Sequence, residues 1–325
     1  MDLSGILIYV LFIFGLVLIT KGADWFVDSA VSISKRSGIP KAVIGATIVS
    51  FATTAPEFTV SFMAAISGHA DMAIGNAVGS TICNIGIAIG FIAILKTITV
   101  DDKAFNVKAL LLLLSGAALF LLCIDGMITW VDGLILLAVF AAYMVYTYLA
   151  QKKNPEGAAS CELPDDKTGI WAKVPLSGYK LDAVVFIAGA ALVILGSKLV
   201  VDNGITIAQQ LGIPELIISL TVISVGTSLP EIVTAITSYK KGCQELSVGN
   251  IVGANVLDIT MILGVSSLFA KLPVNSQLMS YDFIFMMILF VLLAIFGYKK
   301  RITRWQGGLI AVIYVIYVIG LFVWV

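Results

Sequence analysis

The sequence predicts an all-α integral membrane protein in which ten transmembrane helices form two inverted five-helix repeats. Three observations predict this class: the composition, the length of the apolar segments and an internal repeat. Hydrophobic residues make up 59% of the chain and charged residues 12%, whereas soluble domains are about 45–50% apolar and about 25% charged. The composition therefore excludes an ordinary soluble domain.

Apolar segments of about 20 residues, the length that crosses a bilayer as a helix, recur along the chain. Ten are predicted, at residues 5–32, 40–67, 72–96, 106–123, 128–149, 181–206, 213–239, 246–270, 280–298 and 304–324. The first segment follows no basic region and is too long for a signal peptide, so we interpret it as a spanning helix.

A polar stretch separates the fifth and sixth segments and is rich in Lys, Asp, Pro, Gly and Ser. It divides the chain into a first repeat (1–150), a linker (151–180) and a second repeat (181–325). Basic residues gather on the linker side of the predicted membrane, as at Lys35-Arg36 and Lys240-Lys241, whereas Lys271 is nearly alone on the other side. The linker is therefore expected in the cytoplasm and both termini outside, in the cell (inner) membrane.

The second half of the chain repeats the first at one constant separation, which is the separation of Glu231 from Glu57. We call this separation the repeat offset. Further pairs at the repeat offset are Asp28 with Asp202, Gly38-Ile39-Pro40 with Gly212-Ile213-Pro214, Pro56 with Pro230, Gly75-Asn76 with Gly249-Asn250, Gly79 with Gly253, and Gly90 with Gly264. Five spans is an odd number, so the second copy enters the membrane upside down. Inverted repeats with interrupted helices and a site near the midplane are typical of secondary transporters.

Glu57 and Glu231 are the strongest candidate site residues. A carboxylate within a spanning segment costs about 2.5–3.5 kcal/mol, so each needs a partner or a function. Pro56 and Pro230 each remove a helical hydrogen bond. The carbonyls around them are then expected to be free to bind a ligand, at Ser50–Thr53 in the first repeat and Ser224–Thr227 in the second.

Hydroxyl groups accompany both glutamates at helical spacing. Thr53 and Thr54 share a helix face with Glu57, and Thr227 and Ser228 repeat this arrangement before Glu231. Carboxylates, carbonyls and hydroxyls are oxygen ligands that suit hard cations such as Ca²⁺ or Na⁺. The alternative is a kinked helix with a structural glutamate hydrogen-bonded to a neighbour.

The next span of each repeat adds a second pair of polar positions. Ser80 and Asn84 follow Gly75-Asn-Ala-Val-Gly79 at i,i+4 spacing, and Ala254 and Asp258 occupy the matching positions. The small-xxx-small patterns indicate close helix packing. We expect Asn84 and Asp258 to face inward, opposite the two glutamates. An interhelical hydrogen bond is the structural alternative for Asn84.

These motifs resemble the two α-repeats of the cation/Ca²⁺ exchanger superfamily, and the prokaryotic sodium/calcium exchangers most of all. The resemblance rests on Thr-Thr-Ala-Pro-Glu57 and Gly-Thr-Ser-Leu-Pro-Glu231, each followed by Gly-Asn-x-x-Gly-(Ser/Ala), and covers the whole chain. It implies that Ca²⁺ binds the two glutamates, two threonines and two backbone carbonyls: Glu57, Glu231, Thr53, Thr227, Ser50 and Ser224. It also implies Na⁺ ligands at Thr54, Ser228 and Ser80, with Asn84 and Asp258 as a central polar pair.

The chain departs from that pattern in both repeats. The first repeat has Ala52, Thr54 and Ala55 where Gly, Ser and Leu are usual, and Thr54 keeps the hydroxyl. Ala254 stands where serine is common and removes an oxygen that Ser80 retains. One Na⁺ site is therefore expected to be weaker or completed by water or a carbonyl, and the number of Na⁺ ions per Ca²⁺ stays open.

The expected function is Na⁺/Ca²⁺ antiport by alternating access, with the first and sixth helices sliding across the site-bearing core. We expect no enzyme activity, no cofactor and no nucleic-acid partner, and a monomer surrounded by lipid. Alternatives are Ca²⁺/H⁺ or K⁺-dependent antiport and, from another class, a passive cation channel. A membrane enzyme is disfavoured because His69 is the only histidine and the four cysteines form no ligand-spaced cluster.

Overall fold

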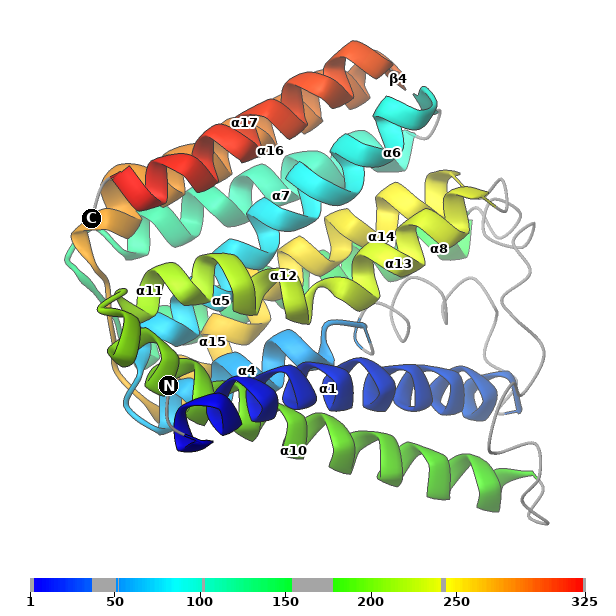
Figure 1. The fold of residues 1–325 in the computed structure, drawn as a ribbon. Helices are drawn as coiled ribbons and strands as arrows, with labels where there is room; N and C mark the ends of the chain where they lie inside the picture. The colour runs from blue at the N-terminus through cyan, green and yellow to red at the C-terminus, as the bar shows by residue number, and fades with distance from the viewer. Residues whose placement is uncertain are drawn as a thin grey trace.

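The structure, a computed structural model, describes residues 3–36, 51, 53–100, 103–153, 178–240 and 244–323. These residues are almost entirely helical (Figure 1). Among them, seven helices are long and apolar enough to cross a membrane, by length and composition. The predicted class of an all-helical membrane protein is therefore confirmed.

The described helices of the first half follow the predicted spans within a few residues. They are α1 (Leu3–Arg36), α4 (Ala55–Ile66), α5 (Ala70–Cys83), the π-helix η2 (Asn84–Ile89), α6 (Gly90–Leu95), α7 (Lys103–Leu122) and α8 (Trp130–Lys153). The start of the predicted span 40–67, with Ser50, lies outside the described residues. So does most of the predicted linker.

The second half has a closely similar order of elements. They are α10 (Tyr179–Leu211), α11 (Glu215–Ile218), η4 (Ser219–Ile223), α12 (Ser224–Thr227), α13 (Leu229–Lys240), α14 (Gln244–Val256), η5 (Leu257–Ile262), α15 (Leu263–Phe269), η6 (Leu278–Asp282), α16 (Phe283–Tyr298) and α17 (Arg304–Val323). The segments α5–η2–α6 and α14–η5–α15 each continue without a loop, so a π-helix lies in the middle of each.

The helices α1 and α10 lie side by side along one flank of the molecule (Figure 1). They have 34 and 33 residues, about 50 Å at 1.5 Å per residue, which exceeds a hydrocarbon core of about 30 Å. Glycines bring their backbones close together. A Cβ on Gly15 would lie 2.9 Å from the Gly196 carbonyl oxygen, and one on Gly22 would lie 2.8 Å from that of Gly189.

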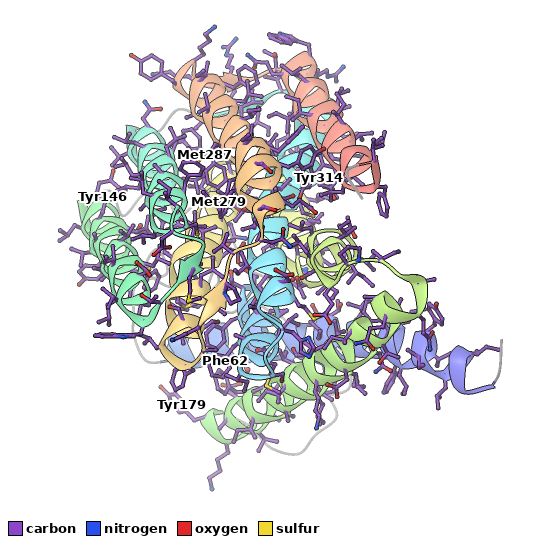
Figure 2. The ribbon with its side chains drawn as sticks, turned by 90° about the vertical axis from the view of Figure 1, so that its left-hand side faces the viewer. Phe62, Tyr146, Tyr179, Met279, Met287 and Tyr314 are labelled. Carbon is purple, nitrogen blue, oxygen red and sulfur yellow. The ribbon has the colours of Figure 1, made fainter. Side chains whose placement is uncertain are left out.

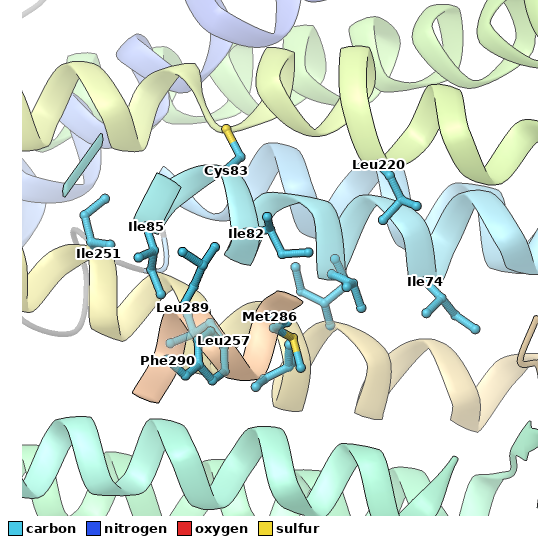
Figure 3. Close-up of a cluster of buried hydrophobic side chains, with 14 of the residues drawn as sticks. Ile74, Ile82, Cys83, Ile85, Leu220, Ile251, Leu257, Met286, Leu289 and Phe290 are labelled. Atoms are coloured by element: carbon cyan, nitrogen blue, oxygen red, sulfur yellow. The ribbon is translucent and has the colours of Figure 1, made fainter. Parts of the chain in front are cut away.

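The centre of the molecule is formed by the long segments that contain α5 and α14. Of the apolar windows, those in 70–95 and 247–269 are 78% and 83% buried, against 22% for that in 130–150. Side chains of α5 and η2 meet those of η4, η5 and α16 in one apolar cluster (Figure 3). Tyr146 and Tyr179 lie at the periphery instead (Figure 2). The outer helices therefore enclose a central pair that carries polar motifs.

Two short strand pairs join the halves. β1 (Ile98–Thr99) pairs with β4 (Arg301–Ile302), and β2 (Met127–Ile128) pairs with β3 (Leu272–Pro273), both antiparallel. Ile98 is opposite Ile302, and Leu272 is opposite Ile128. The repeat offset converts the first pairing into the second, since it carries Ile98 to Leu272 and Ile128 to Ile302. The residues just before β2 and β4 also match in backbone conformation, since both have positive φ: 83° at Gly126 and 60° at Lys300.

His69 connects the two halves at the turn between α4 and α5. Its Nδ1 atom lies 2.8 Å from Oε2 of Glu215, the first residue of α11. The side chains of both residues are partly exposed, at 29% and 24%. The single histidine is therefore a partly exposed partner of a carboxylate.

Candidate ion-binding site

Both polar segments interrupt their helices at the same position. Thr54 precedes α4 with φ −79° and ψ 0°, and Ser228 separates α12 from α13 with φ −78° and ψ 1°. These angles lie close to the sparsely populated bridge region, where many active-site residues sit. Pro56 and Pro230 then fall in the first turn of α4 and α13, where a missing N–H costs no helical hydrogen bond.

Glu57 and Glu231 follow these prolines in the first turn of their helices, where a negative charge is favoured. Each carboxylate accepts a hydrogen bond from the opposite segment. Ser228 Oγ donates to Glu57 Oε1 at 3.0 Å, and Thr54 Oγ1 donates to Glu231 Oε1 at 3.3 Å. All four side chains are buried. The two glutamates therefore belong to one site that both halves build.

The two remaining predicted hydroxyls lie beside the same carboxylates. Thr227 lies beside Glu57, and Thr53 lies beside Glu231. Asn76 of α5 supports this arrangement from behind: its Nδ2 donates to the Glu57 carbonyl at 3.2 Å, and its Oδ1 accepts from Thr227 Oγ1 at 3.1 Å. The structure thus brings together four hydroxyls and two carboxylates from the two Pro-Glu segments.

The carbonyl of Ser224, which the resemblance assigns to the Ca²⁺ site, already accepts two hydrogen bonds in this structure. It accepts the Ser228 amide at 3.0 Å and the Thr227 hydroxyl at 3.2 Å. A helical N–H pairs with the carbonyl four residues earlier, so the missing N–H of Pro230 does not affect the bond between the Ser228 amide and the Ser224 carbonyl. The matching carbonyl, that of Ser50, lies outside the described residues.

The central helices carry a polar stripe each. Asn76, Ser80 and Asn84 recur every four residues along α5 and into η2, so they share one face. The matching stripe on α14 and η5 is Asn250, Ala254 and Asp258. All six residues are buried. Asn84 and Asp258 both lie in the first turn of a π-helix, a distortion that is frequent at functional sites.

Asn84 also contacts the opposite half. Its Nδ2 donates to Asn255 Oδ1 at 3.1 Å, and Asn255 Nδ2 donates to the Thr81 carbonyl at 3.3 Å. Neither Asn76 nor Asn255 was predicted as part of the site. The Gly-Asn-x-x-Gly pattern that contains Asn76 suggests only helix packing, and nothing in the sequence singles out Asn255.

Six oxygen atoms of the predicted site residues are buried without a hydrogen-bond partner among the described residues. They are Glu57 Oε2, Glu231 Oε2, Asp258 Oδ1 and Oδ2, Asn84 Oδ1 and Ser80 Oγ. The other buried oxygens in this condition are single hydroxyls at Thr147, Ser197, Ser266 and Thr303. A buried polar atom without a partner costs about 1–3 kcal/mol, and a charged one more.

This donor set fits a hard cation. Carboxylate, amide and hydroxyl oxygens are the ligands that Ca²⁺ takes, six to eight at a time. The described residues hold no group of three or more His, Cys, Asp or Glu side chains that could bind a metal ion. A cation bound by the six oxygens above would have both carboxylate and neutral oxygen ligands.

Comparison with known proteins gives matches along nearly the whole chain. The sodium/calcium exchanger protein family matches residues 7–149 and 181–323. The chain is 35% identical to an uncharacterized membrane protein of Methanocaldococcus jannaschii, over 95% of this chain and 96% of that protein. It is 28% identical to a sodium/calcium exchanger of Methanosarcina acetivorans, over 97% and 98%.

A solved structure is similar over the same extent. It is a sodium-calcium exchanger soaked with Na⁺ and Sr²⁺, with 33% sequence identity, a TM-score of 0.66, and coverage of 96% of this chain and 97% of that chain.

Proposed function

The chain belongs to the sodium/calcium exchanger protein family, and we propose that it is a secondary antiporter that exchanges Na⁺ for Ca²⁺ across the cell (inner) membrane by alternating access. The observation that carries the proposal is the set of buried oxygens without partners, contributed by both halves of one chain. Because one chain supplies the whole set, a monomer suffices for transport.

In the proposed Ca²⁺ complex, the ion lies between Glu57 and Glu231. Thr53 and Thr227 add hydroxyl oxygens, and the carbonyls of Ser50 and Ser224 complete the shell. The Ser224 carbonyl becomes available when the Thr227 hydroxyl donates its hydrogen to Asn76 Oδ1 alone and presents a lone pair to the ion. In the proposed Na⁺ complex, Thr54, Ser228 and Ser80 supply hydroxyl oxygens, and Asn84 and Asp258 form the centre.

Sharing of oxygens accounts for coupling between the two ions. Two carboxylates neutralise one Ca²⁺ or two Na⁺, so both loads cannot occupy the same oxygens at once. The hydroxyls of Ser228 and Thr54 donate to Glu57 and Glu231. A hydroxyl has one donor hydrogen and two lone pairs, so each can keep this bond while a lone pair binds a cation. A Na⁺ ion at these hydroxyls would therefore lie beside the two carboxylates that the proposed Ca²⁺ ion uses.

The proposed architecture is ten spanning helices in two inverted five-helix repeats, residues 1–150 and 181–325, with the linker 151–180 in the cytoplasm and both termini outside. Two features related by the repeat offset support it. The offset converts the residue pairing of one strand pair into that of the other. It also relates the two crossed hydrogen bonds of the site, since it carries Thr54 to Ser228 and Glu57 to Glu231.

The proposed moving part is the pair α1 and α10, which slides across the core that holds the site. The contacts of this pair obey the same offset: Gly15 faces Gly196, and Gly189 faces Gly22. Small residues at the interface let the two backbones stay close. The two helices can then move together as one unit while the site stays fixed.

Ca²⁺ uptake into proteoliposomes tests the proposal. Vesicles loaded with Na⁺ should accumulate Ca²⁺, and choline-loaded vesicles should not. Acid-loaded vesicles are the third arm, because Ca²⁺/H⁺ antiport is the second candidate function. It is favoured by Asp258, a buried carboxylate with both oxygens unpartnered among the described residues, which could carry a proton. Uptake driven by the proton gradient alone would move the protein to that class.

Two further alternatives are separated by the same assay. External K⁺ is varied to detect a K⁺-dependent antiporter. Flux that needs no counter-ion and does not saturate would indicate a passive cation channel and contradict the proposal.

A further inference from the structure

A chain of two amide groups crosses from one half of the molecule to the other beside the site. Asn84 Nδ2 donates to Asn255 Oδ1 at 3.1 Å, and Asn255 Nδ2 donates to the backbone carbonyl of Thr81 at 3.3 Å. The three residues are fully buried. The chain ends at Asn84 Oδ1, which has no hydrogen-bond partner among the described residues.

The chemistry of these groups fixes the direction of the chain. A backbone carbonyl only accepts, so Asn255 must turn its NH₂ group toward Thr81 and its oxygen toward Asn84. Asn84 must then turn its NH₂ group toward Asn255, which leaves its own oxygen facing away. The orientation of both amides therefore follows from one backbone carbonyl. If the amide group of Asn84 were flipped, it would present hydrogens to a cation in place of an oxygen.

The matching positions of the other repeat lack this restraint. The repeat offset relates Asn84 to Asp258 and Thr81 to Asn255. The Thr81 hydroxyl donates to the Val78 carbonyl of its own helix at 2.7 Å, so this hydrogen is not available to Asp258. Both oxygens of Asp258 are without a hydrogen-bond partner among the described residues. One member of the central pair is held in place and the other is not.

We propose that Asn255 is a positioning residue for cation binding: it holds Asn84 with the amide oxygen toward the site. Asn84 is then a rigid neutral ligand, and Asp258 is the ligand that adjusts to the ion. This inference rests on the proposed function. It predicts that loss of Asn255 weakens cation binding through Asn84 and leaves the transport movement unchanged.

The test replaces Asn255 with leucine, which has a similar size and cannot form either hydrogen bond. In proteoliposomes, N255L should raise the half-saturating concentration of Na⁺, Ca²⁺ or both by about tenfold, the lower end of what hydrogen-bond partners of metal ligands contribute to affinity. The maximal rate should stay within about twofold. S115A is the matched control, because the Ser115 hydroxyl donates to the Leu111 carbonyl of its own helix, α7, and it should change neither quantity.

A double-mutant cycle separates positioning from a general packing effect. If Asn255 acts through Asn84, then N84L and the double variant N84L/N255L should have the same half-saturating concentrations. Additive losses would overturn the proposal, as would N255L with unchanged half-saturation or with a reduced maximal rate alone. N255T, which carries the residue of the matching position, replaces N255L if that variant does not fold. The same comparison applies to the rise in Tm caused by added Ca²⁺ or Na⁺.

The wild-type protein in the same assay distinguishes the two hypotheses. Absence of Na⁺-dependent Ca²⁺ uptake by the wild type contradicts the proposed function. Normal exchange by the wild type together with unchanged exchange by N255L contradicts only the role of Asn255.

Discussion

At the helix breaks, the two halves of the molecule differ by one degree in φ and one in ψ: Thr54 has −79° and 0°, and Ser228 has −78° and 1°. Along the central helices they diverge. The stripe on α5 has a hydroxyl at Ser80 and an amide at Asn84, whereas its counterpart has a methyl group at Ala254 and a carboxylate at Asp258. The backbone scaffold is thus duplicated closely, and the oxygen atoms that it presents are not. We infer that the scaffold constrains both halves and that each half sets its own ion preference.

The largest expected effect comes from removing the negative charge of either glutamate, a feature of the site that is the same in both halves. E57Q and E231Q should each reduce Ca²⁺ transport by about 100-fold or more, since Ca²⁺ affinity depends strongly on the number of charged ligands and 100-fold corresponds to ~2.7 kcal/mol. The measurement is uptake of radioactive Ca²⁺ into Na⁺-loaded vesicles. Substantial residual exchange in either variant would contradict the assigned site.

A smaller effect is expected at the glycines between α1 and α10. The repeat offset relates Gly22 to Gly196, so G22V and G196V should slow exchange equally, by about tenfold, because overpacking costs about 1–3 kcal/mol. Half-saturating Ca²⁺ should stay the same, since the site is not touched. G308A is the control, because a Cβ at Gly308 would meet no atom within 4 Å. Unequal effects of G22V and G196V would show that the two halves do not contribute equally to the movement of α1 and α10.

Adding a hydroxyl to the second stripe, or removing it from the first, should change the half-saturating Na⁺ concentration. A254S restores the oxygen that Ser80 has in the first half and should lower half-saturating Na⁺ by about fivefold, the equivalent of ~1 kcal/mol for one polar contact. S80A should raise it by a similar factor. The Na⁺ dependence of Ca²⁺ uptake measures both. If A254S has no effect while S80A does, water or a carbonyl already completes the second half.

The smallest expected effect concerns the turns just before β2 and β4. Gly126 and Lys300 both have positive φ, 83° and 60°. A non-glycine residue there is strained by about 1–2 kcal/mol, and glycine costs about 0.5–1 kcal/mol of backbone entropy. K300G should therefore raise the Tm in detergent by about one or two degrees, and G126A should lower it. A lower Tm for K300G would show that the lysine side chain contributes more than its backbone strain costs.

Much of the fold could be predicted because long apolar segments and helix-breaking prolines are local signals. The predicted span 72–96 corresponds to a continuous helix over 70–95, and the breaks fall two residues before Pro56 and Pro230. The π-helices that begin near Asn84 and Asp258 were not predicted, because no residue pattern distinguishes them from α-helix. The same holds for the crossed bonds of Thr54 and Ser228, which depend on packing between segments that are far apart in sequence.

The residues of the candidate site differ in how well local sequence reveals them. Glu57 and Glu231 are recognisable since a buried charge is costly wherever it lies. Asn255 is not, because an asparagine in a membrane helix has no distinctive cost until its partner is known. The Ser224 carbonyl shows a further difference: whether a carbonyl is available to a ligand depends on the amide and hydroxyl groups that already donate to it, and the sequence does not show these.

The two strand pairs have a mechanical consequence. Each pair takes one strand from each half, and the 20 residues of α7, about 30 Å, lie between β1 and β2 along the chain. The strand pairs therefore join the two halves at two places that are about a bilayer thickness apart. Because the halves are joined at both ends, they resist hinge-like separation at either end. The motion that this arrangement leaves is sliding along one side of the molecule. Neither α1 nor α10 contains a residue of these strand pairs, so the proposed sliding of the two helices would break neither pair.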